Sequence, residues 1–93
     1  MDLVAVRVVI EGRVQGVWYR GWTVDQARAR GLDGWVRNRM DGTVEALFAG
    51  PAAEVRAMVE ACRAGPPAAR VAQVREFADR PPDAPGFEQL PTM

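Results

Sequence analysis

The chain has 93 residues, an apolar fraction of 48% and a formal net charge of zero, which fit one small globular domain and exclude a disordered chain. Histidine, lysine and serine are all absent, so the twelve basic residues are arginines. These absences exclude a Ser-His-Asp or Cys-His nucleophile pair and a Walker phosphate loop, and the single cysteine, Cys62, allows neither an internal disulfide nor a zinc site.

The first predicted element is a strand over residues 4–11. Side chains at even positions from Val4 to Ile10 are uniformly apolar, whereas those at odd positions are mixed, as expected for a strand with one more apolar face. The strand is predicted to end near Gly12, and residues 13–20 form a glycine-flanked loop. Helical spacing of apolar residues from the end of this loop to Gly31 predicts a helix there.

Two further strands are predicted on either side of an Asp-Gly pair. Residues 34–39 and 43–48 flank Met40, Asp41 and Gly42, and Asp-Gly is a strong signal for a tight hairpin turn. These two strands are therefore expected to be antiparallel neighbours.

The clearest helix follows Pro51, a residue that suits a first helical turn. Its apolar positions recur at i, i+3, i+4 and i+7, and the sequence Gly65-Pro66-Pro67 ends it. The apolar stripe comprises Val55, Met58, Val59 and Cys62. Cys62 is therefore expected to be a buried apolar residue and not a nucleophile.

A last long strand is predicted over residues 71–77. Val71 and Val74 fall on opposite parities, so this strand requires a β-bulge or a late start. The segment 79–85 contains three prolines and is expected to be a loop, and residues 87–90 are expected to add a short edge strand.

The order strand, helix, strand, strand, helix, strand favours an α+β fold. In the ferredoxin-like βαββαβ sandwich, two helices cover one face of an antiparallel sheet. We expect residues 1–93 to form a single domain and a monomer. No apolar run approaches the roughly 20 residues of a membrane span and no signal peptide is evident, so we expect a cytoplasmic protein without a membrane partner.

The loop after the first strand is a candidate anion site. A loop that enters a helix exposes backbone N–H groups without intrahelical partners, and the helix dipole adds to their attraction for an anion. The amides from Gln15 to Tyr19 could form such a nest, with Arg20 adding a two-pronged contact to phosphate oxygens. A glycine loop before a helix is also ordinary turn chemistry, so the spacing alone leaves both interpretations open.

Asn38 is the second candidate. It lies two residues before the predicted hairpin turn and shares the parity of Val36, so both side chains should point to the helix side of the sheet. Its carboxamide would then lie near the junction of loop and helix. An asparagine beside a turn commonly bonds local backbone instead, and the sequence alone does not separate the two roles.

Two segments resemble the signatures of a known family. Residues 12–20, Gly-Arg-Val-Gln-Gly-Val-Trp-Tyr-Arg, closely resemble the first acylphosphatase signature, and residues 34–38 with 41–45 resemble the second. With the Gly-Pro helix start and the Gly-Pro-Pro junction, the resemblance covers roughly residues 4–78. It departs from the family at Tyr19, where phenylalanine is common, and at Arg39, where a smaller residue is common.

The resemblance implies a ferredoxin-like fold and the hydrolysis of a small-molecule acyl phosphate to a carboxylate and inorganic phosphate, with no cofactor and no metal. It implies two catalytic residues, Arg20 as the phosphate-binding arginine and Asn38 as the residue that holds the attacking water. The phosphate would be enclosed by the backbone amides of Gln15, Gly16, Val17, Trp18 and Tyr19.

Two other functions fit the same element order. A module that binds phosphate or an acyl-phosphate metabolite without turnover is disfavoured by the presence of both Arg20 and Asn38. An RNA binder of the RRM type would present aromatic residues on the open face of its central strands, but Phe48 shares the parity of Val44 and Ala46. Residues 1–40 carry seven arginines against four acids, an excess too small for nucleic acid, so we expect no such partner.

Overall fold

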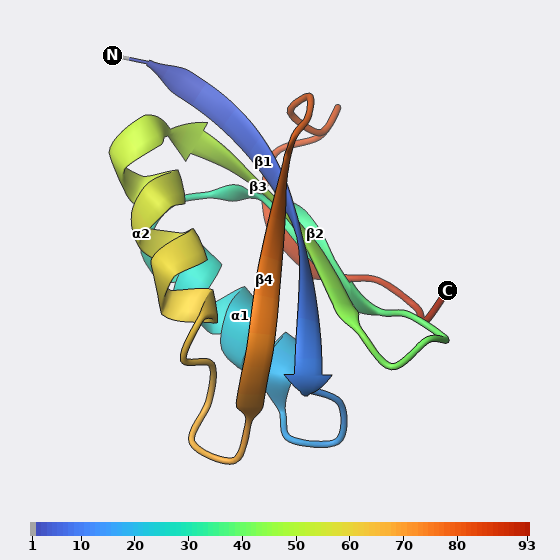
Figure 1. Ribbon diagram of the computed structural model, residues 1–93. Coiled ribbons are helices and arrows are strands. Elements are labelled where there is room, and N and C mark those ends of the chain that lie inside the picture. Colours follow the sequence, from blue (N-terminus) through green and yellow to red (C-terminus); the bar gives the residue numbers. More distant parts are fainter. Residues whose placement is uncertain (1) are drawn as a thin grey trace.

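The structure, a computed structural model, describes residues 2–93 and consists of one sheet with two helices packed on it (Figure 1). The elements in chain order are β1 (Leu3–Arg13), α1 (Tyr19–Ala29), β2 (Asp33–Asn38), β3 (Val44–Pro51), α2 (Ala52–Cys62), β4 (Arg70–Ala78) and β5 (Phe87–Gln89). The predicted βαββαβ order and the short additional strand are confirmed.

The five strands lie in the order β4-β1-β3-β2-β5. β1 pairs antiparallel with β3 and β4, and β2 pairs antiparallel with β3, as the hairpin signal predicted. Between β4 and β5 the chain crosses from one edge of the sheet to the other, where β5 pairs with β2. This pairing is parallel, so the complete sheet is mixed. β3 continues past Phe48 to Pro51 because it stays paired with the long β1, where Pro51 lies opposite Leu3.

Both helices cover the same face of the sheet, and the core lies between the helices and the sheet (Figure 1). The predicted stripe of α2 is buried, and Val8, Ile10 and Val36 meet it from the strands. Phe48 is also in this core, as its parity predicted. Burying each of these larger side chains contributes about 1.5–3 kcal/mol, so this face determines how the strands are oriented.

A β-bulge resolves the parity conflict of the last strand. The register between β1 and β4 shifts between Glu11 and Gly12, which leaves Ala72 as the additional residue. Val71 and Val74 can then both pack against the core. Gly12 has φ +129° and a Cβ there would lie 2.2 Å from the Arg70 carbonyl oxygen, so the close approach of the strands requires glycine.

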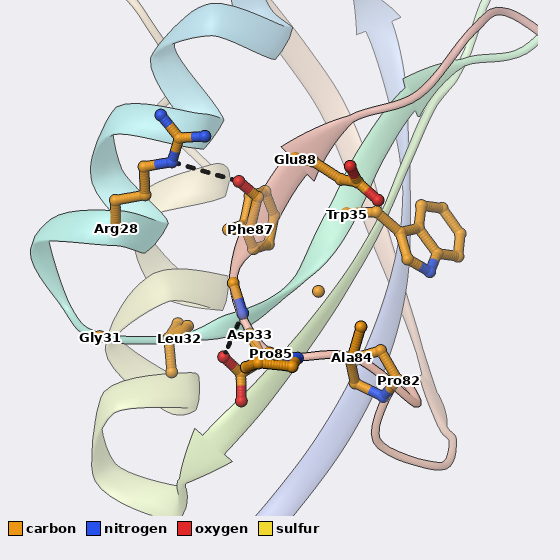
Figure 2. A pocket seen from close by; sticks show the side chains of 12 residues that line it. Arg28, Gly31, Leu32, Asp33, Trp35, Pro82, Ala84, Pro85, Phe87 and Glu88 are labelled. Atoms are coloured by element: carbon orange, nitrogen blue, oxygen red, sulfur yellow. Dashed lines mark hydrogen bonds between the residues drawn. The ribbon is translucent and has the colours of Figure 1, made fainter.

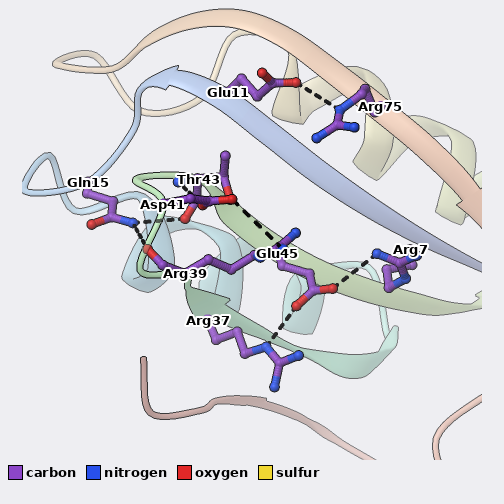
Figure 3. A network of polar contacts seen from close by, with 9 residues as sticks. All are labelled: Arg7, Glu11, Gln15, Arg37, Arg39, Asp41, Thr43, Glu45 and Arg75. Carbon is purple, nitrogen blue, oxygen red and sulfur yellow. Dashed lines mark hydrogen bonds and ion pairs between the residues drawn. The ribbon is translucent and has the colours of Figure 1, made fainter. Parts of the chain in front are cut away.

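The open face of the sheet carries paired charges (Figure 3). Glu45 is buried, and its carboxylate accepts from Arg7 Nη1 at 3.1 Å and from Arg37 Nε at 2.8 Å. The same guanidinium groups lie over the rings of Phe77 and Trp35. Within residues 2–93 neither helix is long and apolar enough to cross a membrane.

Candidate functional site

The loop between β1 and α1 is held in a conformation that few side chains adopt. Gly16 has φ +74°, and Trp18, the residue that precedes α1, has φ +67°. Trp18 is the sole non-glycine residue with positive φ among those described, and this conformation costs about 1–2 kcal/mol. Its side chain does not cap α1, and the first turn contains no acid. The N–H groups at the start of α1 therefore lack a side-chain acceptor.

Gly21 allows the Trp18 side chain to lie against the first turn of α1. A Cβ at Gly21 would lie 2.1 Å from Trp18 Nε1, so no larger residue fits under the indole in this position. Glycine inside a helix costs about 1 kcal/mol relative to alanine. The indole itself is 63% exposed, so it covers the helix start without entering the core.

The Gln15 side chain connects the loop to the β2–β3 hairpin (Figure 3). Its Nε2 donates to the carbonyl oxygens of Arg39 at 2.8 Å and Thr43 at 2.9 Å. The hairpin is itself closed by Asp41, whose Oδ1 accepts from Thr43 Oγ1 at 2.6 Å and from the Thr43 N–H at 3.0 Å. These bonds, the Thr43 hydroxyl first, lower the pKa of Asp41. The loop and the end of β2 are therefore fixed relative to each other.

A cavity of about 190 Å³ lies between the loop, the start of α1 and the end of β2. Because liquid water occupies about 30 Å³ per molecule, this volume accommodates an ion the size of phosphate with a few waters. Its lining residues are Val14, Gly16, Trp18, Tyr19, Arg20, Gly21, Asn38 and Gln89. Five of the seven residues predicted for the site thus line one cavity. Gln15 and Val17 do not line it, because one bonds the hairpin and the other packs against the core.

Asn38 lines this cavity and carries a buried acceptor without a partner. It is the last residue of β2, it is 8% exposed, and its Oδ1 is buried without a hydrogen-bond donor. The structure therefore shows no hydrogen bond from nearby backbone to this oxygen, which was the alternative role for Asn38. A buried acceptor left unpaired costs about 1–3 kcal/mol, which a donor such as a bound water would offset.

Arg20, the second residue of α1, lines the same cavity, and its side chain forms no hydrogen bond or ion pair with any residue in the described range 2–93. Arg39, which follows Asn38, pairs with Asp41 at 3.9 Å and is not part of the cavity lining. The cavity is therefore lined by one arginine without a partner and by one asparagine whose side-chain oxygen has no hydrogen-bond donor, a combination suited to an anion and a water.

The Tyr19 hydroxyl has a structural partner. It donates to the carbonyl oxygen of Cys62 at the end of α2. In a continuing helix that oxygen would accept from the N–H of residue 66, but Pro66 has none. Burial raises the pKa of Tyr19 well above its usual value and raises the pKa of the Cys62 thiol to about 12. Neither group can serve as a base or a nucleophile near neutral pH.

A larger cavity, of about 570 Å³, lies at the other end of β2 (Figure 2). Two of its polar side chains have backbone partners: Asp33 Oδ1 accepts from the Gly86 N–H at 2.8 Å, and Arg28 Nε donates to the Phe87 carbonyl at 3.2 Å. Its third charged residue, Glu88, is exposed to solvent. Among residues 2–93 there is no group of three or more acids or cysteines positioned to hold a metal ion. The smaller cavity is therefore the better candidate.

Sequence reasoning missed two residues of this site. Gln89 lines the cavity because β5 pairs with β2 and sets Gln89 opposite Val36, a pairing across the chain that no local pattern reveals. Gln15 was assigned only a backbone amide, whereas its side chain holds the loop to the hairpin. Gln89 follows Glu88, and both lie between Phe87 and Leu90, so the local sequence contains no signal that distinguishes Gln89.

Comparison with known proteins gives a consistent result. The sequence model of the acylphosphatase family matches residues 6–89. The acylphosphatase of Rhodospirillum rubrum is 63% identical over 86 residues, which cover 92% of this chain and 94% of that protein. The acylphosphatase of Rhizorhabdus wittichii is 54% identical over 93 residues, covering 99% and 93%.

Solved structures show the same fold. An acylphosphatase from Coxiella burnetii superposes with a TM-score of 0.91 at 29% identity, covering 96% of this chain and 94% of that one. The acylphosphatase from Bacillus subtilis superposes with a TM-score of 0.88 at 36% identity, covering 96% and 99%. The similarity extends over nearly the whole of each relative.

Proposed function

Since the chain belongs to the acylphosphatase family, we propose that its loop, Arg20 and Asn38 carry out the hydrolysis of an acyl phosphate to a carboxylate and inorganic phosphate. The elements that line the cavity all belong to one sheet and the helices on it. We therefore also propose that residues 1–93 form one domain whose monomer contains the complete site.

The phosphate is bound by charge and by backbone donors. Of the predicted nest from Gln15 to Tyr19, three residues line the cavity, namely Gly16, Trp18 and Tyr19. Their amides and the dipole of α1 attract the phosphate oxygens, and the Arg20 guanidinium contacts two of them. Two observations support this role: the N–H groups at the start of α1 have no side-chain cap, and Arg20 has no acidic partner among residues 2–93. Because these groups are already in place, they stabilise the transition state without reorganising.

Asn38 orients the attacking water. Its unpaired Oδ1 accepts a hydrogen from the water, which directs a lone pair of that water toward phosphorus. The new bond forms between the water oxygen and phosphorus while the bond from phosphorus to the acyl oxygen breaks, and its electron pair leaves with the carboxylate. A phosphate oxygen takes the proton of the water, because no side chain that lines the cavity is a base near neutral pH.

The observation that carries this proposal is that Arg20 and Asn38 line the same cavity and that neither the Arg20 guanidinium nor Asn38 Oδ1 has a partner among residues 2–93. A carboxylate is already a good leaving group, so position and charge are sufficient and an acid catalyst is not required. The missing histidine is consistent with this chemistry.

The test is release of inorganic phosphate from benzoyl phosphate, measured with and without a chelator. We expect turnover at the same rate in both conditions, and inorganic phosphate as a competitive inhibitor. Phosphate binding without turnover would indicate a binding module, and loss of activity with the chelator would replace the mechanism with a metal-dependent one.

A further inference from the structure

Arginines without a partner gather around the loop. Within residues 2–93, five arginine side chains have neither a hydrogen bond nor an ion pair, whereas the other seven have at least one. These five are Arg13, Arg20, Arg56, Arg70 and Arg80. Arg13 ends β1 and Arg70 begins β4, whereas Arg20 lies in the first turn of α1 and is the one of the five that lines the cavity of the proposed function.

Arg13 and Arg70 face each other directly across the last pair of β1 and β4. Like charges opposite each other in an antiparallel pair destabilise it, and an anion between them would remove that repulsion. Both side chains are exposed. The nearest acid along β1, Glu11, cannot serve because it pairs with Arg75 at 2.8 Å (Figure 3).

The two arginines line a groove of about 470 Å³. Its remaining walls are Gly16 and Val17 of the loop and residues 67–69, which precede β4. Gly16 lines both this groove and the cavity that holds Arg20 and Asn38. Gly16 has no side chain, and a Cβ there would have no heavy atom within 4 Å, so the point that the two spaces share is open.

We propose that this groove is a second anion subsite, which binds a carboxylate or phosphate carried on the acyl part of the substrate. The inference rests on the proposed function, because it needs the acyl phosphate to be held by the loop. In-line attack sets the acyl group on the side of phosphorus away from the water. Consistent with this, neither Asn38 nor Gln89 lines the groove.

The experiment compares two substrates that differ by one charge, benzoyl phosphate and 3-carboxybenzoyl phosphate. The variant is Arg13→Gln combined with Arg70→Gln. Exposed ion pairs are weak, so each arginine should contribute roughly two- to fivefold to kcat/KM for the carboxylated substrate. The double variant should lose about tenfold on that substrate and change less than about twofold on benzoyl phosphate. Added salt should reduce the preference in the unaltered protein.

Arg80→Gln is the matched control, since it removes an equally unpaired and exposed arginine beyond the other end of β4. It should leave the ratio of the two kcat/KM values unchanged. Equal losses on both substrates, an unchanged ratio in the double variant, or a changed ratio in Arg80→Gln would each overturn the proposed subsite.

The same two arginines could instead bind a free anion that is not part of the substrate. Inhibition by isophthalate and benzoate, measured with benzoyl phosphate as substrate, distinguishes the two sources. If the double variant weakened inhibition by isophthalate but left kcat/KM for 3-carboxybenzoyl phosphate unchanged, the groove would bind free anions and the substrate subsite would be wrong. Failure of the unaltered protein to hydrolyse either substrate would instead overturn the proposed function, and the subsite with it.

Discussion

β2 begins beside one cavity and ends beside another, and the two cavities differ in how their polar groups are bonded. At the start of the strand, Asp33 and Arg28 each have a backbone partner around a space of about 570 Å³. At its end, Asn38 and Arg20 have none around a space of about 190 Å³. Volume alone would select the start of the strand. Unpaired polar groups identify the end where a ligand supplies the missing bonds.

The end at Asn38 is also the costly end. The positive φ of Trp18 and the unpaired Asn38 oxygen each cost on the order of 1–3 kcal/mol. Neither feature stabilises the folded chain. At the start of β2, by contrast, Asp33 and Arg28 form hydrogen bonds with backbone groups. The difference supports the interpretation that the strained end is organised around substrate.

The strongest test of this comparison replaces, in separate variants, two arginines of α1. Arg20→Ala and Arg20→Lys should both lose about a thousandfold or more in kcat/KM, because lysine cannot reproduce a planar contact to two phosphate oxygens. Arg28→Ala, at the other cavity, is the matched control and should retain activity within about twofold. The assay is phosphate release from benzoyl phosphate. Near-normal turnover in Arg20→Lys would contradict the assigned role.

The second prediction concerns the last residue of β2. Asn38→Ala should lower kcat by about a hundredfold or more, as loss of one positioning donor or acceptor in an active site commonly does. Inorganic phosphate should still inhibit competitively, because Asn38 contacts the water and not the phosphate in the proposed mechanism. The free energy of unfolding should be unchanged or higher, since the substitution removes an unpaired buried acceptor. Loss of phosphate inhibition with an intact fold would move Asn38 to the phosphate-binding set.

The third prediction is thermal. Phosphate at ten times its dissociation constant should add about 1.4 kcal/mol to the stability of the folded state. For a domain of this size, that corresponds to a rise in Tm of roughly 6–11 °C. The rise should disappear in Arg20→Ala and persist in Arg28→Ala. A rise that persists in Arg20→Ala would place the anion site elsewhere.

Much of the fold could be predicted from local patterns, because burial of one face fixes parity. The alternation in β1, the Asp-Gly turn and the stripe of α2 each correspond to a structural element. The parity conflict at Val71 and Val74 predicted a bulge or a late strand start, and the structure shows the bulge. The parallel pairing of β5 with β2 could not be predicted, because it depends on where a long loop delivers three residues.

The candidate site follows the same division. Parity placed Asn38 on the helix side, and the loop pattern placed Arg20 at the start of α1, where both line one cavity. Gln89 and the Gln15 side chain act between segments far apart in the sequence, so only the folded chain reveals them. The catalytic roles of Arg20 and Asn38 stay predictions.

The fourth prediction tests the paired end of β2. Asp33→Ala removes the acceptor for the Gly86 N–H, which should lower the free energy of unfolding by about 0.5–1.5 kcal/mol. Turnover of benzoyl phosphate should remain within about twofold, because the bond only secures the loop before β5. A large loss of activity at unchanged stability would show that the larger cavity takes part in function.

The smallest expected effect is on the pH dependence of kcat. The proposed mechanism uses no side chain as a base, so kcat should vary little between about pH 5 and pH 8 for a substrate with constant ionisation in that range. Burial raises the pKa of Cys62 from 9.0 to about 12 in the folded chain. The stability gained by keeping this thiol neutral is therefore fully present below about pH 9 and is lost as the pH rises toward 12, outside the assay range.

Cys62→Ala should cost roughly 0.5–3 kcal/mol of stability and leave kcat unchanged. A kcat that rose tenfold per pH unit and vanished in a folded Cys62→Ala variant would require a covalent mechanism in place of attack by water.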